Sequence, residues 1–341
     1  MNEREILLYN SLKGLHLLSK APKKRVVSDL LGLQAQFSRN PKHSLWLRAS
    51  DYAPETWDEG LVKLWSHRGT MHVVPAGEIG LHICAMDRRA PYGDVAPWMG
   101  EGEPEKWSAF IVEQIRGGNH TRDGLKSACL AAGMSEDTLK IAFHGWGGLI
   151  RDMCYAGTIV LGTGTEKTYF LPPATAFMPR DEARKIMLRR YFEHFGPATL
   201  ADMRHFFTGW RRRETGPLLE EVLPELMKTE IGGETYYHAR PLVTDAELPE
   251  CVLVPGFDQL VLGYKDRSRM VDDAHKGRVV NAQGIVFPTV IVRGRMRAAW
   301  KIEGDTFKVT PFERLPRKDE AAIRREVVKK LAPAVKKVEF T

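Results

Sequence analysis

The sequence predicts an α+β protein in which tandem units of three helices and a β-hairpin precede a C-terminal β domain. Three observations predict this class. Apolar residues recur with a helical period along most of residues 1–245. The order of three helices and a hairpin occurs twice between residues 99 and 245, with breaks at corresponding places. From residue 246 onward, short runs rich in Val and Ile lie between turn residues, as is typical of strands.

Residues 99–178 form the first complete unit. Its first helix ends at Gly117-Gly118, and Thr121 is expected to cap the second helix. One long third helix is expected to run through the apolar stripe Leu139, Ala142, Phe143, Trp146, Leu149, Ile150 and Met153. A hairpin over residues 158–171 follows, with its turn at residues 162–165.

Residues 179–245 repeat this order. The first helix ends at Gly196-Pro197, and Thr199 with Asp202 resembles a capping box at the start of the second helix. The third helix is expected to extend to Leu226, although Pro224 interrupts its pattern. The hairpin then turns at Gly232-Gly233.

Residues 1–98 are expected to be a third, looser copy of the unit. Its helices and strand are expected over residues 8–15, 23–37, 56–65 and 70–74. Residues 246–341 are expected to form a small β-barrel or sheet. The strands fall near 251–254, 286–292, 296–302 and 307–309, and a charged helix is expected over 319–331.

Three helices followed by a β-hairpin form the plan of a winged helix, which is a helix-turn-helix with a wing. The helices of the two copies end at helix-breaking residues in corresponding places, which favours this interpretation. The alternative is a generic helical repeat.

The amino-acid composition limits the classes of protein to which the chain can belong. The chain has 341 residues, 43% of them hydrophobic, so it can bury a packed core. The net charge of +7 and the pI near 9.1 are compatible with a polyanionic partner such as DNA, and also with many ordinary enzymes. The four cysteines are far apart and form no CxxC pair, which argues against a disulfide framework or a zinc site. We expect no metal, no cofactor, no membrane segment and a cytoplasmic location.

Gln34 and Gln36 form the most informative motif, two carboxamides one residue apart at the end of an apolar run. A glutamine cannot act as a general base, but it can hold a water molecule or a polar substrate atom. A catalytic pair of this kind therefore needs a bond that is already weak. In an unbroken helix the two side chains point about 200° apart, so they can share a target only if the helix ends or unwinds. The alternative is two solvated residues at a helix end.

Basic residues occur in short clusters. Lys23, Lys24 and Arg25 form one cluster, and Arg211, Arg212 and Arg213 form another between two helices of their unit. Further clusters are Arg184 with Arg189-Arg190, and Arg293, Arg295 and Arg297. Each could be a solvated face, but together they could line a phosphate-binding channel, with residues 211–213 as the preferred DNA contact.

His72 and Arg68 lie beside the expected wing of the first unit, where they could line a substrate site or form ordinary strand contacts. Asp258 and Asp266 resemble catalytic carboxylates, but roles in turns and ion pairs are preferred, with Arg267 beside Asp266. The segment at residues 162–165 lacks the Lys of a phosphate-binding loop, so a wing turn is preferred.

Taken together, these residues resemble the winged-helix DNA glycosylases of the AlkZ-like family over nearly the whole chain. The segments that carry the resemblance are Leu33-Gln34-Ala35-Gln36, Arg68-Gly69-Thr70-Met71-His72-Val73-Val74-Pro75, and Val254-Pro255-Gly256-Phe257-Asp258 through Asp266-Arg267.

The resemblance implies three tandem winged helices and a β domain arranged as a C-shaped clamp around duplex DNA. The expected domains are residues 1–98, 99–178, 179–245 and 246–341. It also implies monofunctional hydrolysis of the N-glycosidic bond of N7-alkylguanine, including bulky adducts and interstrand crosslinks. Gln34 and Gln36 match the Gln-x-Gln motif of the family and inherit its catalytic role. The expected partner is double-stranded DNA with alkylated purines, bound by a monomer at the nucleoid.

Two alternatives remain open at this point. A non-catalytic winged-helix regulator would bind a specific sequence without releasing a base, and would usually dimerise. A divergent member of the family would act on an unknown nucleic-acid substrate with the same fold.

Overall fold

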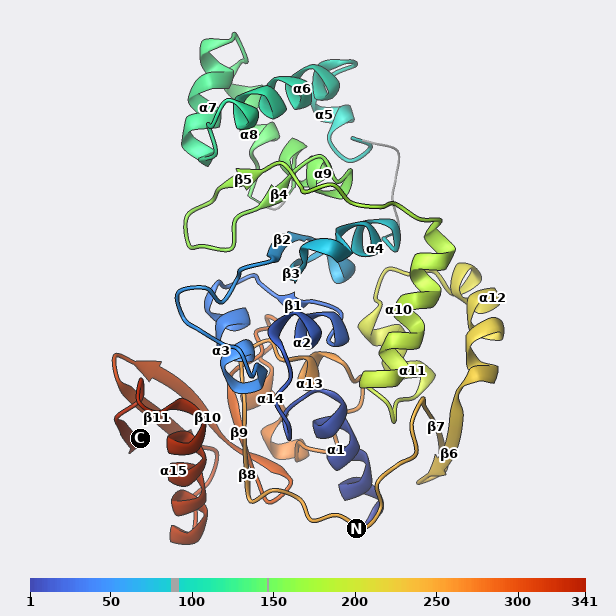
Figure 1. The fold of residues 1–341 in the computed structure, drawn as a ribbon, viewed down its shortest axis with the longest axis vertical. Helices are drawn as coiled ribbons and strands as arrows, with labels where there is room; N and C mark the ends of the chain where they lie inside the picture. Colours follow the sequence, from blue (N-terminus) through green and yellow to red (C-terminus); the bar gives the residue numbers. More distant parts are fainter. Residues whose placement is uncertain (87–91, 146) are drawn as a thin grey trace. The chain divides into compact units, whose positions relative to one another are not determined.

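The structure is a computed structural model that describes residues 1–86, 92–145 and 147–341. The chain divides into two compact units. Unit 1 comprises Met1–Trp57, Ile186–Thr208 and Arg212–Thr341, and unit 2 comprises Asp58–Lys185 and Gly209–Arg211. The fold is a mixture of helices and sheets, as expected (Figure 1). The division into four domains stays a prediction. Within the described residues, no helix has the length and apolarity needed to cross a membrane.

Unit 1 begins with α1 (Glu3–Gly14), α2 (Lys23–Asp29), the two-residue strand β1 (Leu33–Gln34) and α3 (Arg39–Arg48). The helix expected over residues 23–37 is wrong beyond Asp29. Leu31 (φ 56°) and Gly32 (φ 87°) both adopt left-handed backbone conformations, which end a helix. The chain therefore continues as an extended segment into α3, a helix that the sequence pattern did not indicate.

Three helices and a hairpin occur in the order expected for residues 179–245. They are α10 (Arg180–His194, in unit 1 from Ile186), α11 (Leu200–Phe206), α12 (Arg212–Val222), β6 (Met227–Ile231) and β7 (Glu234–His238). The capping box is confirmed, because Thr199 Oγ1 accepts from Asp202 N at 3.1 Å and the Asp202 carboxylate accepts from Thr199 N at 3.0 Å. The helix ends at Val222, and a 3₁₀ turn at Leu223–Glu225 contains Pro224, which cannot donate the next helical hydrogen bond.

The C-terminal part of unit 1 is a five-stranded sheet rather than a closed barrel. Its strands are β8 (Cys251–Val254), β9 (Thr289–Val292), β10 (Arg295–Glu303), β11 (Thr306–Pro311) and β12 (Lys337–Phe340), in the order β12-β11-β10-β9-β8. The pairs are antiparallel except β11 with β12. Helix α15 (Arg317–Leu331) packs Ile323 and Val327 into the core formed by Trp300 and Phe307, and Figure 1 shows it beside the sheet. The short helices α13 (Gln259–Leu262) and α14 (Lys276–Val279) lie between β8 and β9 in sequence.

Unit 2 contains the strands β2 (Leu61–Trp65), β3 (Met71–Pro75), β4 (Val160–Leu161) and β5 (Tyr169–Phe170), in the order β3-β2-β4-β5. The helix expected over residues 56–65 is therefore wrong. Leu61–Trp65 pairs residue by residue with Met71–Pro75, and this antiparallel pairing with the next strand prevails over a helical pattern that was short and weak. The expected hairpin of residues 158–171 is confirmed, with Val160 opposite Phe170.

The helices of unit 2 are α4 (Ile79–Cys84), α5 (Ala96–Met99), α6 (Glu103–Arg116), α7 (Arg122–Ala131), α8 (Glu136–Ala142) and α9 (Leu149–Tyr155). The cap at Thr121 is confirmed, because its side chain accepts from Gly124 N at 3.1 Å. The single long third helix is wrong, since α8 and α9 are separate. Gly148 between them has φ 80°, and a Cβ there would lie 2.0 Å from Ile141 O. Trp146, expected in the stripe, lies outside the described residues.

Candidate active site

The Gln-x-Gln segment follows a tight turn at the end of α2. The helix ends at Asp29, before both glutamines, so the separation of about 200° expected in an unbroken helix does not apply to them. That the two carboxamides share one target stays a prediction. Leu33 and Gln34 form the strand β1, and Gln36 lies in the bend that follows it. Gln34 is buried, with 7% of its surface exposed.

Gln36 is partly buried, and its carboxamide oxygen carries the clearest chemical signal of the segment. Oε1 is enclosed and accepts no hydrogen bond from the residues that the structure describes. A buried polar atom without a partner costs free energy, so it is typical of a position that binds water or a ligand. Gln36 thus has an acceptor available for chemistry.

The segment Phe257-Asp258-Gln259 contacts the N-terminal part of unit 1 at three places, and Gln259 contacts the turn itself. The Phe257 ring lies 5.7 Å from the Phe37 ring, between centroids. Asp258 pairs with Arg48 at 2.8 Å, and both side chains are fully buried. The Gln259 carboxamide donates to Gly32 O and, at 3.4 Å, to Leu30 O. The polar groups that hold the turn therefore come from a part of the chain more than 200 residues away in sequence.

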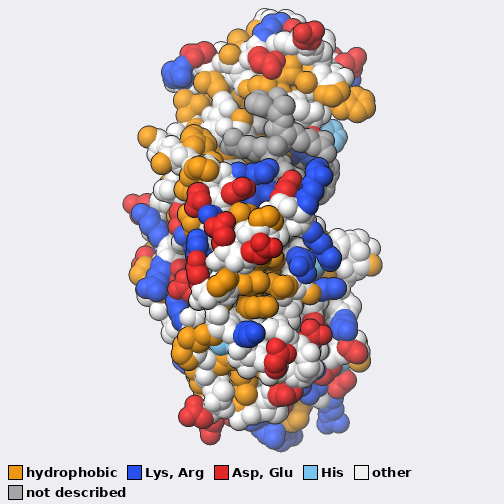
Figure 2. All heavy atoms as spheres, turned by 90° about the vertical axis from the view of Figure 1, so that its right-hand side faces the viewer, with side chains coloured by type: hydrophobic (Ala, Val, Ile, Leu, Met, Phe, Trp, Pro, Cys, Tyr) orange, Lys and Arg blue, Asp and Glu red, His pale blue; other side chains and the backbone are white. Residues whose placement is uncertain are grey.

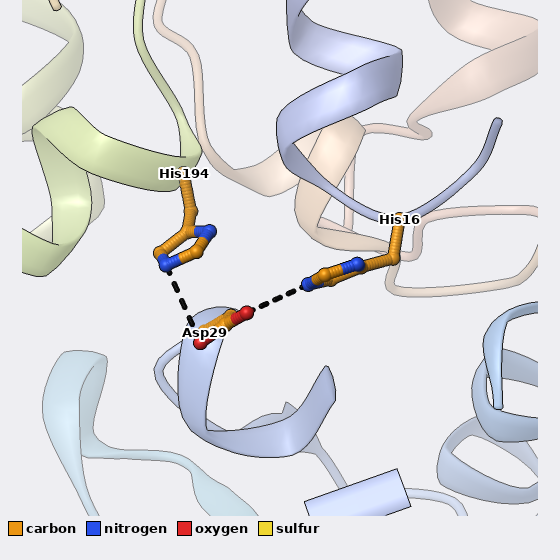
Figure 3. A group of neighbouring side chains, drawn as sticks. All are labelled: His16, Asp29 and His194. Carbon is orange, nitrogen blue, oxygen red and sulfur yellow. Dashed lines mark hydrogen bonds and ion pairs between the residues drawn. The ribbon is translucent and has the colours of Figure 1, made fainter. Parts of the chain in front are cut away.

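A second polar group lies at the C-terminal end of α2, where the side chain of Asp29, the last residue of the helix, lies between two histidines (Figure 3). Asp29 Oδ2 lies 2.8 Å from His16 Nε2, and Asp29 Oδ1 lies 3.3 Å from His194 Nε2. Burial opposes the charged carboxylate, but the hydrogen bond with His16 and the charge of His194 lower the pKa of Asp29 below its usual value. Burial also lowers the pKa of His194, although Asp29 opposes that shift.

These three side chains are the residues that could hold a metal ion in the described part of the chain, because their ligand atoms all lie within 4.8 Å of one another. Asp29 makes a hydrogen bond to His16 and an ion pair with His194, so both of its carboxylate oxygens already have partners within the group. All four cysteines are free thiols.

Arg68 and His72 lie in unit 2 and contact each other directly. Burial, followed by the charge of Arg68, lowers the pKa of His72 well below its usual value, so the ring is neutral at pH 7. His72 Nδ1 donates to Thr70 O at 3.0 Å, which leaves Nε2 to accept from Arg68 Nη2 at 3.1 Å. Burial lowers the pKa of Arg68 to about 9. This geometry makes His72 a neutral acceptor that fixes the guanidinium of Arg68.

The basic clusters differ in their availability. Lys23 is buried and its ammonium donates to Thr56 O at 2.5 Å, whereas Lys24 and Arg25 are exposed. Arg184 is fully buried and donates to Ala85 O, so it is unsuited to a phosphate channel. The cluster of Arg293, Arg295 and Arg297 is paired with carboxylates of Glu250, Asp319, Asp272 and Glu313.

Arg211, Arg212 and Arg213 are exposed. Arg212 and Arg213 open α12, and neither makes an ion pair with any residue that the structure describes. On the face drawn in Figure 2, Lys and Arg side chains lie among Asp and Glu. Availability for phosphate is therefore a property of particular arginines rather than of the net charge.

The expected structural roles of the two carboxylates are found, with one change of partner. Asp258 caps α13 by accepting from Leu260 N at 2.8 Å, in addition to its pair with Arg48. Asp266 accepts from Ser268 N and Oγ, while Arg267 Nε donates to Val261 O at 2.8 Å. Residues 162–165 lie in the connection between β4 and β5, which spans residues 162–168, as expected for a hairpin turn.

Comparison with known proteins identifies the family. Residues 27–332 match the family described as "DNA glycosylase AlkZ-like". The chain belongs to the AlkZ-like DNA glycosylase family. It is a DNA glycosylase, as expected, and the alternative of a non-catalytic regulator is set aside.

A sequence comparison and a structural comparison, both with Streptomyces sahachiroi, agree with this family. A protein described as an interstrand DNA cross-link repair glycosylase is 26% identical over 320 residues, which cover 85% of this chain and 86% of that protein. The solved structure of the DNA glycosylase AlkZ matches with a TM-score of 0.79 and 22% identity, covering all of both chains. The second likeness shows a shared fold.

Sequence reasoning found the two glutamines of this family member but missed the residues that hold them. Gln259 binds the turn at residues 30–32, and His16 and His194 bind Asp29, the residue before it. Arg48 holds Asp258, the neighbour of Gln259. All of these contacts join residues that are well separated in the sequence. The signal that could have indicated one of them is Gln259, a polar residue directly after the motif residues 254–258 and before the apolar run 260–262.

Proposed function

We propose that this glycosylase hydrolyses the N-glycosidic bond of N7-alkylated guanine in double-stranded DNA, including bulky adducts and interstrand crosslinks. The enclosed, unpartnered Oε1 of Gln36 is the observation that carries the proposal. The activity for which the Streptomyces relative is named, interstrand DNA cross-link repair, supports the choice of substrate.

The chemistry of the substrate explains why carboxamides suffice. Alkylation at N7 gives the guanine a positive charge, so the base leaves as a neutral molecule without protonation, and no general acid is required. The sugar develops positive charge as the bond breaks. The remaining tasks are to place a water molecule and to stabilise that charge, and oriented amide dipoles can do both.

In the proposed mechanism, Gln36 Oε1 accepts a hydrogen bond from the attacking water, and Gln34 holds the lesion or the adjacent sugar edge. Water attacks the anomeric carbon as the bond to the purine nitrogen breaks. The attacking water releases one proton to the solvent, and the positive charge of the lesion leaves with that proton. The products are a neutral free base and an abasic site, with the phosphodiester backbone intact. The reaction uses no amine nucleophile, which makes the enzyme monofunctional.

We propose Lys24, Arg25, Arg211, Arg212 and Arg213 as phosphate contacts, because these side chains are exposed. Lys23 is left out, since its ammonium already binds a backbone carbonyl. Arg68 and His72 are proposed to line the substrate site. We propose that His72 there keeps Arg68 fixed and does not act as a base.

The arrangement of three helices and a hairpin in residues 180–238 supports the winged-helix interpretation for that part of the chain. We propose that the other two units are variants of the same plan, one with a divided third helix. A monomer acting at the nucleoid is proposed as the working form.

The test uses one duplex with a single N7-methylguanine and another with an N7-linked interstrand crosslink. Wild-type protein should give a strand break at the lesion only after alkali, which reports an abasic site. The variant Gln34→Ala/Gln36→Ala should give none above the enzyme-free rate, and Gln283→Ala, at an exposed glutamine, should behave as wild type. Release by the double Ala variant at the wild-type rate would refute the assignment of the two glutamines.

A further inference from the structure

The turn that presents the Gln-x-Gln segment has a backbone conformation that needs external support. Leu31 has φ 56°, a left-handed conformation that leucine rarely adopts, and its side chain is fully buried. The turn also follows a helix C-terminus, where the last carbonyl groups have no partner within the helix. Something outside the local sequence must therefore hold the turn between Leu30 and Gly32.

Gln259 supplies the first support. It is the first residue of α13 and is 1% exposed, and its carboxamide donates to both Leu30 O and Gly32 O. One NH2 group thus satisfies two carbonyls on either side of Leu31. An ionised carboxylate at this position could not donate a hydrogen bond to either carbonyl. An apolar side chain would also leave both carbonyls without this donor.

The position of Gln259 is itself fixed. Asp258 caps α13 at Leu260 N and pairs with the buried Arg48, whose Nε donates to Leu15 O at 2.8 Å. The donor therefore lies at the start of a capped helix whose N-cap residue is held by a buried ion pair.

The His16–Asp29–His194 group supplies the second support, at the residue that precedes the turn (Figure 3). Asp29 ends α2, His194 ends α10 and His16 follows α1, so the carboxylate joins three helix ends. A carboxylate is unfavourable at a helix C-terminus unless cationic or donor groups meet it there. Arg190 Nη1 adds a bond to Ser28 O at 3.3 Å.

We propose that Gln259 and Asp29 are positioning residues of the glycosylase reaction, which hold the turn at residues 30–32 so that Gln34 and Gln36 keep their catalytic geometry. The proposal rests on the catalytic role of those two glutamines. It assigns a task to two buried polar groups that the chemistry at the lesion does not use directly.

The experiment combines kinetics with amide hydrogen exchange. Gln259→Met keeps the length of the side chain and removes both donors, and Asp29→Asn keeps the shape and removes the charge. The matched control is Gln283→Met, the same substitution at an exposed glutamine. Each protein is assayed under single turnover on the N7-methylguanine duplex, with DNA affinity measured separately.

We expect Gln259→Met and Asp29→Asn to slow base release by about 10- to 100-fold, as small displacements of catalytic groups do, while the Kd for DNA changes by less than about twofold. Amides in a peptide covering residues 30–38 should exchange faster, and amides of β10 and β11 should not change. The control should match wild type in every readout.

Other outcomes decide against the proposal. An unchanged rate, or a slower rate with unchanged exchange at residues 30–38, would overturn it. Faster exchange throughout unit 1 would assign Gln259 to general stability instead. If Gln259→Met fails to fold, Asp29→Asn decides by the same measurements. An inactive wild-type protein would reject the proposed function, while the exchange data would still show whether the two groups hold the turn.

Discussion

Arg48 and Asp258 form an ion pair of 2.8 Å between two side chains that are both fully buried. The pair joins the end of α3 to the start of α13, 210 residues apart in sequence. Arg48 also binds Ser44 Oγ and Leu15 O, so its donors are distributed over three elements of unit 1. A buried pair of this kind is costly to break, because removal of one partner leaves the other charged and unpaired.

The variant Asp258→Ala should therefore destabilise the protein by about 3–5 kcal/mol, which urea unfolding at pH 7.5 can measure. Asp266→Ala is the control. Asp266 is exposed and binds Ser268, so its loss should cost less than about 1 kcal/mol. If both substitutions lowered the free energy of unfolding equally, the predicted large contribution of the buried pair to stability would be wrong.

Replacement of Gln36 by Ala should lower the single-turnover rate of base release by about 10²- to 10³-fold, the usual cost of removing one oriented hydrogen-bonding group from an active site. DNA affinity should stay nearly constant, since the carboxamide carries no charge. Fluorescence anisotropy on the same duplex measures that affinity. A loss of binding equal to the loss of rate would show that Gln36 acts in recognition and not in catalysis.

Acid should destabilise the protein below about pH 6.5, the usual pKa of histidine. Burial lowers the pKa values of His67 and His72 well below this value in the folded protein. The unfolded chain therefore binds more protons as the pH falls through 6.5, and the free energy of unfolding decreases by about 1.4 kcal/mol per pH unit for each histidine. Above pH 6.5 both states hold these rings neutral, and the stabilisation is complete.

Urea unfolding at pH 7.5, 6.5 and 5.5 would measure how the free energy of unfolding depends on pH. His72→Gln should lower the slope of that dependence by the contribution of one histidine. A glutamine can still accept from Arg68, which makes the substitution conservative. A slope that is the same in the variant and in the wild type would show that His72 does not titrate in this way.

The salt dependence of DNA binding should identify the phosphate contacts. Log affinity should fall linearly with log salt concentration, and Arg213→Ala should reduce the slope by about 0.9, because the variant binds one phosphate fewer. Arg293→Ala is a suitable control, because Arg293 already pairs with Glu250 and Asp319. An unchanged slope in Arg213→Ala would remove Arg213 from the interface.

Dialysis against EDTA should leave the rate of base release unchanged. The leaving base is already cationic, so the proposed mechanism needs no Lewis acid. Both carboxylate oxygens of Asp29 are already engaged, one by a hydrogen bond with His16 and the other by an ion pair with His194. A loss of activity that zinc restores, and that Asp29→Asn abolishes, would instead assign a metal to this group.

The sequence alone determined the features that depend on neighbouring residues. The capping box at Thr199 and Asp202, the cap at Thr121 and the hairpin at Gly232-Gly233 are local, because a side chain or a turn satisfies backbone groups within a few residues. The Gln-x-Gln motif and the resemblance to the glycosylase family could also be identified from short segments.

Tertiary structure decided what local patterns left ambiguous. Residues 61–65 became a strand because β3 pairs with them, and α2 stopped at Asp29 because a left-handed turn is held by Gln259 from 227 residues away. The supports of the active segment could not be predicted, since a hydrogen bond between distant residues has no periodicity in the sequence. Its formation depends on the cost of closing a long loop, which only the packed fold can offset.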